Sequence, residues 1–215
     1  LLECAGQLTG GYFAEPGRKD VPDMAHLGFP YAEVDADGYA VLAKAPGTGG
    51  RLSLQTCKEQ LFYEVTDPHA YLTPDVAVDF TAVALREAGA DRVAVTGAAA
   101  RGRPANLKVS VGYRGGFIGE GEISYAGPGA AARGRLAGDI MRERLGGEVE
   151  ALQIDLIGID SGHRRGYGNQ PEPYEVRLRV AGKARTRDDA ERVGEEVEAL
   201  FTNGPAAGGG VRRST

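Results

Sequence analysis

The spacing of apolar residues in the second half of the chain predicts a regular succession of strands and helices. Leu107, Val109, Val111 and Tyr113 alternate with smaller or polar residues, which is typical of a strand with one buried face. A glycine turn follows, and residues 117–125 can return as the antiparallel partner of this strand. We therefore expect a β-hairpin at the start of this half.

Two helices and two further strands are predicted after the hairpin. Apolar residues recur at helical spacing over residues 130–145, and again after Thr186, a residue suited to cap a helix N-terminus. Between these helices, residues 152–159 are mostly apolar and residues 174–180 alternate between apolar and charged. The helix side chains expected to face the core are Leu136, Ala137, Ile140, Met141 and Leu145, then Ala190, Val193, Val197, Leu200 and Phe201.

The element order over residues 107–202 is therefore ββαββα. This order predicts an α+β fold with a largely antiparallel or mixed sheet, because helices on one face of such a sheet would bury every apolar stripe. About three main helices are expected to pack against the sheet. We treat residues 1–215 as a single α+β domain.

The first half of the chain is less regular. Residues 1–50 are rich in glycine and mostly irregular. A main helix should begin after Ser53, a plausible N-cap, and its buried stripe includes Cys57, which we therefore assign to the core. The short strands expected in this half cover residues 31–34, 39–44, 76–81 and 92–96.

Composition and charge exclude several classes of partner. The net charge of −5 offers no basic footprint for nucleic acid. The sequence has no apolar run near the roughly 18 residues that a membrane helix needs, so no membrane partner is expected. Cys4 and Cys57 are too few for a disulfide framework, and a reducing cytoplasm is the simplest location.

Glycine accounts for 33 of 215 residues and is concentrated in loops. The loop at residues 47–50 has the clearest mechanism, because glycine lets the backbone approach an anion and N–H groups before the following helix can hold it. The loop lacks the lysine of a Walker-type phosphate loop. The alternative is a strand-to-helix connection that needs positive φ.

A second loop with candidate chemistry covers residues 160–170. His163 and Arg164 lie in it and could bind a carboxylate or phosphate, or His163 could move a proton. The alternative is a solvated hairpin loop. His26, His69 and His163 are far apart and form no local metal motif, so we expect no metal. Cys4 could act as a nucleophile, although cysteine is often a small buried apolar residue.

A series of short blocks, in order along nearly the whole chain, resembles the acyclic terpene utilisation (AtuA-type) family. The opening residues 2–11, LECAGQLTGG, resemble the family's ECG-x-Q-x-TGG run, with Ala5 in place of its glycine. Residues 59–64, EQLFYE, and residues 203–210, NGPAAGGG, continue the series, with an extra Ala207 in the last block. The remaining blocks are Gly28-Phe29-Pro30, Glu33-Val34, Gly47-Thr48-Gly49-Gly50, Asp67-Pro68, residues 71–76 and Leu107-Lys108-Val109.

The resemblance implies a role in the catabolism of acyclic terpenoids, whose intermediates are CoA thioesters. It also implies that a further N-terminal α/β half precedes this chain and is a partner in the site. A lyase or hydro-lyase acting on a branched acyl-CoA or a related carboxylic acid follows from this context. The alternative is a non-catalytic binding or assembly domain whose glycine loops are structural turns.

The residues expected to form the site come from the loops. We expect polar or acid–base roles for Glu3, Thr9 and His163. The substrate anion is expected on Gly10, Gly11, Gly47, Thr48, Gly49, Gly50, Arg164, Gly208, Gly209 and Gly210. No cofactor is expected beyond a CoA thioester as substrate, and we expect a homo-oligomer.

Overall fold

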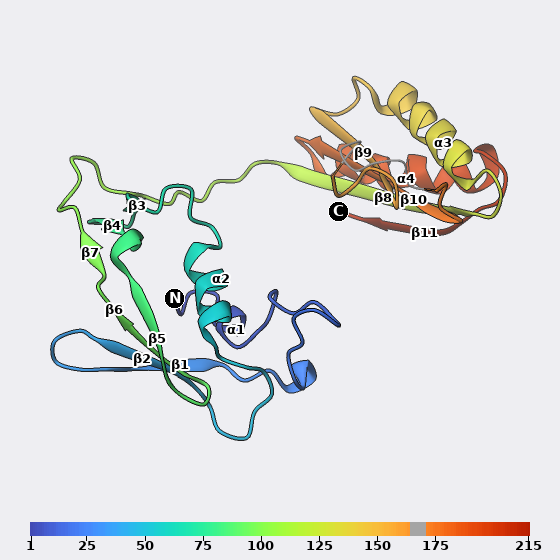
Figure 1. Cartoon of the computed structure of the whole chain (residues 1–215). Coiled ribbons are helices and arrows are strands. Elements are labelled where there is room, and N and C mark those ends of the chain that lie inside the picture. The colour runs from blue at the N-terminus through green and yellow to red at the C-terminus, as the bar shows by residue number, and fades with distance from the viewer. Residues whose placement is uncertain (164–170) are drawn as a thin grey trace. The chain divides into compact units, whose positions relative to one another are not determined.

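The computed structural model describes residues 1–163 and 171–215, and the chain folds into two compact units, residues 1–111 and 112–215 (Figure 1). The sequence led us to expect one domain. The chain instead forms two units because each half buries its own set of apolar side chains. Each unit is described below by itself, and together they form an α+β structure with antiparallel sheets.

An antiparallel sheet of four strands, in the order β1-β2-β6-β5, organises residues 1–111. The strands are β1 (Pro30–Val34), β2 (Ala40–Lys44), β5 (Ala84–Gly89) and β6 (Arg92–Thr96). The expected strands at 31–34, 39–44 and 92–96 are confirmed. Strand β5 was not expected, because its side chains are almost all exposed and its sequence, ALREAG, does not alternate between apolar and polar.

Helix α2 (Leu54–Phe62) begins where the sequence predicts. The Ser53 hydroxyl accepts a hydrogen bond from the Thr56 N–H, and the Thr56 hydroxyl accepts one from the Ser53 N–H, so the two residues form a capping box. Cys57 is completely buried beside Leu8 and Val93, as predicted. The helix packs against the short helix α1 (Ala5–Leu8).

A small sheet completes the first unit, with the strand order β3 (Tyr71–Leu72), β4 (Ala77–Asp79) and β7 (Ala99–Ala100). The strand expected at 76–81 is shorter than predicted. It stops at Asp79 because the Asp79 carboxylate accepts hydrogen bonds from both the N–H and the hydroxyl of Thr81, which starts a 3₁₀ turn at Phe80–Ala82.

The second unit has the order β-α-β-β-α-β within its described residues, 112–163 and 171–215. The elements are β8 (Phe117–Ala126), α3 (Ala130–Leu145), β9 (Ala151–Ile157), β10 (Glu175–Ala184), α4 (Arg187–Asn203) and β11 (Gly208–Ser214). The strands form an antiparallel sheet in the order β11-β8-β10-β9. Both helices cover one face of it (Figure 1).

The predicted ββαββα order is wrong at its first strand and omits the last one. Residues 107–113 form no strand in the described structure, and Leu107 and Tyr113 are 52% and 87% exposed. Strand β8 cannot take them as a hairpin partner, because β10 already pairs with one of its edges and β11 with the other. The local pattern of apolar residues contains no information about the pairing of β8 with distant strands.

The buried faces of the two long helices are largely as predicted, with one correction in each. Ala137, Met141 and Leu145 of α3 are buried, but Leu136 is 53% exposed. In α4, Thr186 caps the helix as predicted, since its hydroxyl accepts from the Asp189 N–H. Phe201, expected in the core, is 61% exposed. Leu136 is exposed because it lies on the side of α3 opposite the buried Gly134 and Met141.

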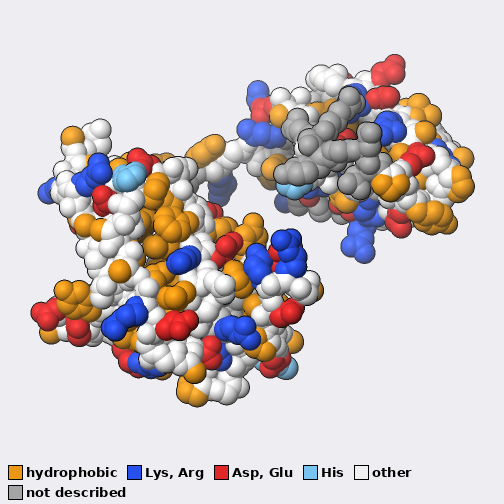
Figure 2. All heavy atoms as spheres, in the orientation of Figure 1, with side chains coloured by type: hydrophobic (Ala, Val, Ile, Leu, Met, Phe, Trp, Pro, Cys, Tyr) orange, Lys and Arg blue, Asp and Glu red, His pale blue; other side chains and the backbone are white. Residues whose placement is uncertain are grey.

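Helix α4 and strand β8 approach each other through glycine. A Cβ atom at Gly121 would lie 2.6 Å from Cβ of Val197, and one at Gly119 would collide with the backbone oxygen of Ala190. The opposite face of the sheet is charged: Arg177 pairs with Glu122 at 2.6 Å and Arg179 with Glu120 at 2.7 Å. Figure 2 shows acidic and basic side chains interspersed on the visible faces.

Among the described residues, no helix is long and apolar enough to cross a bilayer.

Candidate functional site

Thr9 lies in a tightly packed region where three loops of the first unit meet. Its side chain is completely buried, and its hydroxyl donates to the carbonyl oxygens of Gly28 at 2.6 Å and Gly6 at 3.2 Å. The Thr9 carbonyl accepts from the Arg51 N–H at 2.8 Å. In this conformation the hydroxyl holds the loops together and has no access to solvent.

The glycines of the 47–50 loop pack against the same region. The N–H groups of Gly49 and Gly50 donate to the carbonyls of His26 at 2.8 Å and Pro22 at 2.7 Å. Gly50 has φ +89°, and a Cβ there would lie 2.6 Å from the Thr9 oxygen. Gly47 has φ +74° with open space around it. These N–H groups are therefore engaged within the unit rather than directed at an anion.

The neighbouring residues of both loops also contribute to packing. A Cβ at Gly10 would lie 2.6 Å from Val21, and one at Gly11 would lie 2.9 Å from the Gly6 oxygen. The Thr48 hydroxyl donates to the Ala45 carbonyl at 2.6 Å. The structure thus brings the first two predicted glycine segments together, but by packing them against each other.

The other predicted residues belong to the second unit. His163 is exposed in the turn after β9, and Arg164 lies outside the described residues. Gly208 packs against Ile123, and the Gly210 carbonyl accepts from the Arg177 guanidinium at 3.1 Å. Gly209 has no neighbour within 4 Å of an added Cβ. These glycines lie on the edge strand β11 and join it to the sheet.

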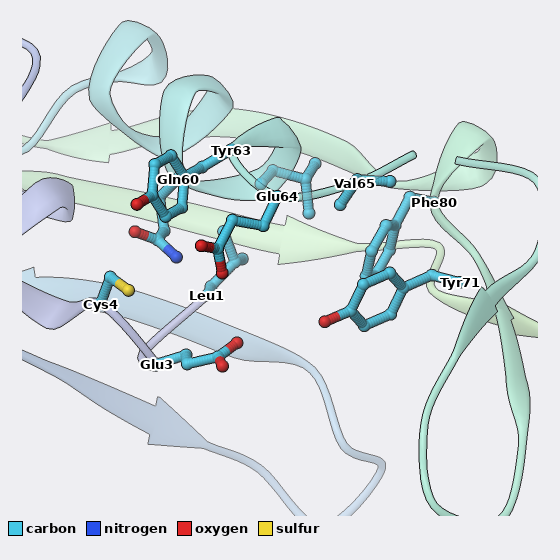
Figure 3. A pocket seen from close by; sticks show the side chains of 10 residues that line it. Leu1, Glu3, Cys4, Gln60, Tyr63, Glu64, Val65, Tyr71 and Phe80 are labelled. Carbon is cyan, nitrogen blue, oxygen red and sulfur yellow. The ribbon is translucent and has the colours of Figure 1, made fainter. Parts of the chain in front are cut away.

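A small pocket of about 90 Å³ gathers chemically capable side chains of the first unit (Figure 3). It lies where the segment before α1 meets the end of α2 and the 71–80 region. Its polar lining consists of Glu3, Cys4, Gln60, Tyr63, Glu64 and Tyr71. Glu3 is thus the predicted catalytic residue that lines this pocket, whereas Thr9 is buried in the packed loops.

Gln60 is the most constrained polar residue of the pocket. It lies on α2, three residues after Cys57, and its side chain is 8% exposed. Its Oε1 atom has no hydrogen-bond partner within residues 1–163 and 171–215. A buried amide oxygen without a partner is costly, so its retention points to a ligand group that satisfies it. Figure 3 shows the carboxamide among the side chains of Cys4, Tyr63 and Glu64.

The electrostatic character of the pocket is acidic. Glu3 and Glu64 line it, and its lining within the described residues contains no lysine, arginine or histidine. The charge of Glu64 raises the pKa of the Tyr63 phenol, with burial and Cys4 adding to the effect. The Tyr63 ring also makes an edge-to-face contact with Tyr12, with 5.6 Å between the ring centroids.

Tyr12 has a left-handed backbone with φ +62°, which is rare for a large side chain. Such conformations cost of order 1–3 kcal/mol and persist where surrounding structure enforces them. Here Gly10 and Gly11 lead into the residue, and the contact with Tyr63 follows from its orientation. The strained backbone therefore supports one wall of the pocket.

Sequence reasoning missed most of this pocket. It gave neither Glu64 nor Gln60 a role in the site. The available signal was position: Gln60 follows Cys57 by three residues and precedes Leu61, so it falls on the apolar stripe. A polar residue on a buried helix face requires a partner, and that requirement marks it as a candidate.

The described residues contain no cluster of three or more His, Cys, Asp or Glu side chains that could hold a metal ion.

One of the comparisons with known proteins, the match to a family model, agrees with the blocks found in the sequence. The family model described as acyclic terpene utilisation family protein AtuA matches residues 1–215. Among solved structures, the de novo designed protein Foldit4 is similar, with 14% identity, a TM-score of 0.30, and coverage of 46% of this chain and 94% of its own. No curated protein matches the chain.

Proposed function

Because the chain belongs to the acyclic terpene utilisation (AtuA) family, we propose that it is part of a catabolic lyase or hydro-lyase acting on a branched acyl-CoA or a related carboxylic acid. Family membership itself ties the chain to acyclic terpene utilisation. The reaction type and the thioester are our proposal, and we assign the chemistry to the pocket of the first unit.

The observation that carries this proposal is the pair of carboxylates in one small pocket. Glu3 and Glu64 come from separate segments and both line it (Figure 3). Addition of water to a double bond next to an acyl group needs one group that takes a proton from water and another that delivers a proton to carbon. Glu3 and Glu64 supply the two carboxyl groups for these two roles.

In this reaction the atoms balance without a cofactor. The water oxygen forms a bond to the β-carbon while one carboxylate takes a proton from that water. The second carboxyl group delivers a proton to the α-carbon, and the product differs from the substrate by one water. The reverse sequence eliminates water. The pocket volume of about 90 Å³ suits a short acyl portion, with the remainder of a CoA thioester outside it.

The glycine loops are given a supporting role in this proposal. The N–H groups of Gly49 and Gly50 donate to carbonyls of the same unit, so they are not counted as anion donors. This packing is also the observation that favours the second candidate, a non-catalytic binding or assembly domain. The two candidates differ in whether the pocket carboxylates affect turnover.

The test uses the natural full-length protein and 3-methylbut-2-enoyl-CoA, a short branched unsaturated thioester. Hydration removes the conjugated double bond, so it is followed by loss of the enoyl absorbance. We expect turnover to fall by about 10²–10⁴-fold in Glu3→Gln and in Glu64→Gln, the range of a lost acid–base group. Glu59→Gln, on the same helix but outside the pocket lining, is the matched control and should retain turnover.

Full turnover in both pocket variants would refute the assignment to this pocket. A ligand that binds the native state raises its stability. If this thioester gives no turnover and no thermal shift, the hydro-lyase proposal is refuted and the binding or assembly candidate is favoured.

A further inference from the structure

Cys4 is the pocket group that water addition does not use. It immediately precedes α1, is partly exposed, and lines the pocket with its sulfur directed toward the space shared with Gln60 and Glu64 (Figure 3). A thiol in that position is accessible to a substrate acyl group in the same pocket. The question is whether the surroundings suit a covalent step.

The second cysteine of the chain has a contrasting environment. Cys57 is completely buried in the core of the same unit, and burial raises the pKa of its thiol to about 11. Cys57 is therefore inert in the folded protein, since the thiolate is the reactive form and this thiol is neither ionised nor accessible. It provides an internal reference for any reaction at Cys4.

Gln60 supplies the independent evidence that this part of the pocket is directed at a ligand. Its side chain is more than nine-tenths buried, and its Oε1 is without a partner in the described part of the chain. A carboxamide offers both an N–H donor and a carbonyl acceptor. The unpaired atom is the acceptor, so it suits an N–H donor of the ligand, such as an amide of the pantetheine arm next to a CoA thioester.

We infer that Cys4 is a covalent acyl acceptor, to which an acyl group is transferred from a thioester bound in this pocket. The inference rests on the thioester in the proposed function and adds a covalent intermediate to it. The Cys4 Sγ forms a bond to the acyl carbon, and the bond between that carbon and the CoA sulfur breaks. The thiol proton passes to Glu64 and then to the departing CoA thiolate, so nothing is oxidised or reduced.

The charges around Cys4 determine how the thiol is activated. Cationic neighbours would stabilise a thiolate permanently, but the pocket lining within the described residues is acidic. The thiol must therefore lose its proton during the attack, to an adjacent base. Glu64 is the candidate, because Figure 3 shows its carboxylate directed toward Gln60 and the Cys4 side of the pocket.

The size of the pocket agrees with transfer of an acyl group from CoA to Cys4. A volume of about 90 Å³ accommodates a short branched acyl group but not the nucleotide part of CoA. Exchange of one thioester for another retains the acyl group in the pocket after CoA leaves.

The test uses the natural full-length protein and 3-methylbutanoyl-CoA. This thioester is saturated, so it cannot alkylate a thiol by conjugate addition. We expect intact mass spectrometry to show a protein species heavier by one acyl group, and peptide mapping to place that group on Cys4 and not on Cys57. Neutral hydroxylamine should remove it, as it cleaves thioesters. Free 3-methylbutanoate should give no adduct.

Three variants test the roles of the neighbours. Cys4→Ala should abolish the adduct. Glu64→Gln should slow its formation by about 10²-fold or more, whereas Glu59→Gln should not. Gln60→Leu removes the acceptor for the ligand and should slow it by about 10-fold, whereas Gln55→Leu, an exposed position on the same helix, should not. Circular dichroism of each variant establishes that it is folded.

The outcomes separate this inference from the proposed function. A thermal shift with the thioester but no adduct on Cys4 overturns the acyl acceptor and leaves the hydro-lyase proposal standing. An adduct that forms equally on Cys57, or that persists in Cys4→Ala, also overturns it. No adduct and no thermal shift would overturn both.

Discussion

The loop at residues 47–50 allows a direct measurement of what its glycines do. Gly47 and Gly50 both have positive φ, +74° and +89°, but only Gly50 is surrounded by atoms. Replacement of each by alanine therefore imposes a similar backbone penalty and a different steric one. We predict that Gly50→Ala destabilises the first unit much more than Gly47→Ala.

The magnitude follows from two contributions. A left-handed backbone costs a non-glycine residue about 1–2 kcal/mol, and the reduced freedom of the unfolded chain offsets about 0.4–1 kcal/mol of this. Gly47→Ala should therefore cost about 0–1.6 kcal/mol. At Gly50 the new Cβ would lie 2.6 Å from the Thr9 oxygen and 2.8 Å from Cδ1 of Leu27. Overpacking of this kind adds about 1–3 kcal/mol, for a total of about 1–5 kcal/mol.

The structure around Gly50 cannot easily move to relieve the contact between an added Cβ and Thr9. The Thr9 carbonyl accepts from the Arg51 N–H, and the Thr9 hydroxyl donates to the Gly28 carbonyl, so movement of Thr9 stretches both hydrogen bonds. Hydrogen exchange followed by mass spectrometry measures the loss on peptides from residues 1–111, with peptides from residues 112–215 as the internal reference. Equal losses for the two variants would refute the packing argument.

Three further predictions test the fold and the thiols. Ser53→Ala removes the hydroxyl that caps α2 and should cost about 1 kcal/mol in the same exchange measurement. Leu178→Ala, in the core of the second unit, should cost about 2–5 kcal/mol, whereas Leu136→Ala, at a half-exposed position, should stay within about 0.5 kcal/mol; equal effects would contradict the corrected helix face. A thiol reagent at pH 8 should label Cys4 in the native protein and Cys57 only after unfolding, and rapid native labelling of Cys57 would contradict its buried, raised-pKa state.

Local patterns were sufficient for elements whose boundaries are set by neighbouring residues. Helix α3 has the predicted bounds, and α2 and α4 begin at the predicted caps Ser53 and Thr186. The resemblance to the family, carried by short blocks, is confirmed over the whole chain. In each case the determinant lies within a few residues along the sequence.

Pairing between strands that are distant in the sequence explains why the strand predicted at residues 107–113 is wrong. The pattern of residues 107–113 is that of a strand, yet β8 pairs with β10 and β11, which lie about 50–90 residues later. Leu136 lies on the side of α3 opposite the buried Gly134, Ala137 and Met141, so it does not belong to the buried stripe. Phe201 falls on the buried stripe of α4, four residues after Val197, yet it is exposed near the end of the helix. Hydrophobic spacing identifies a candidate face without specifying what covers it.

The pocket also forms from segments that are distant in the sequence, so local patterns do not predict it. The glycine blocks contribute to it by allowing these segments to pack. Glu3 and Gln60 share its lining because α1 packs on α2, and the position of α1 depends on Thr9 at its end. Thr9 is held by Gly28 and Arg51, and Gly50 leaves the space that this arrangement needs. The glycines therefore affect the chemistry indirectly, through the packing that positions the pocket. Gly50→Ala should weaken the packing and displace the pocket together, whereas Gly47→Ala should leave the acylation of Cys4 near its original rate.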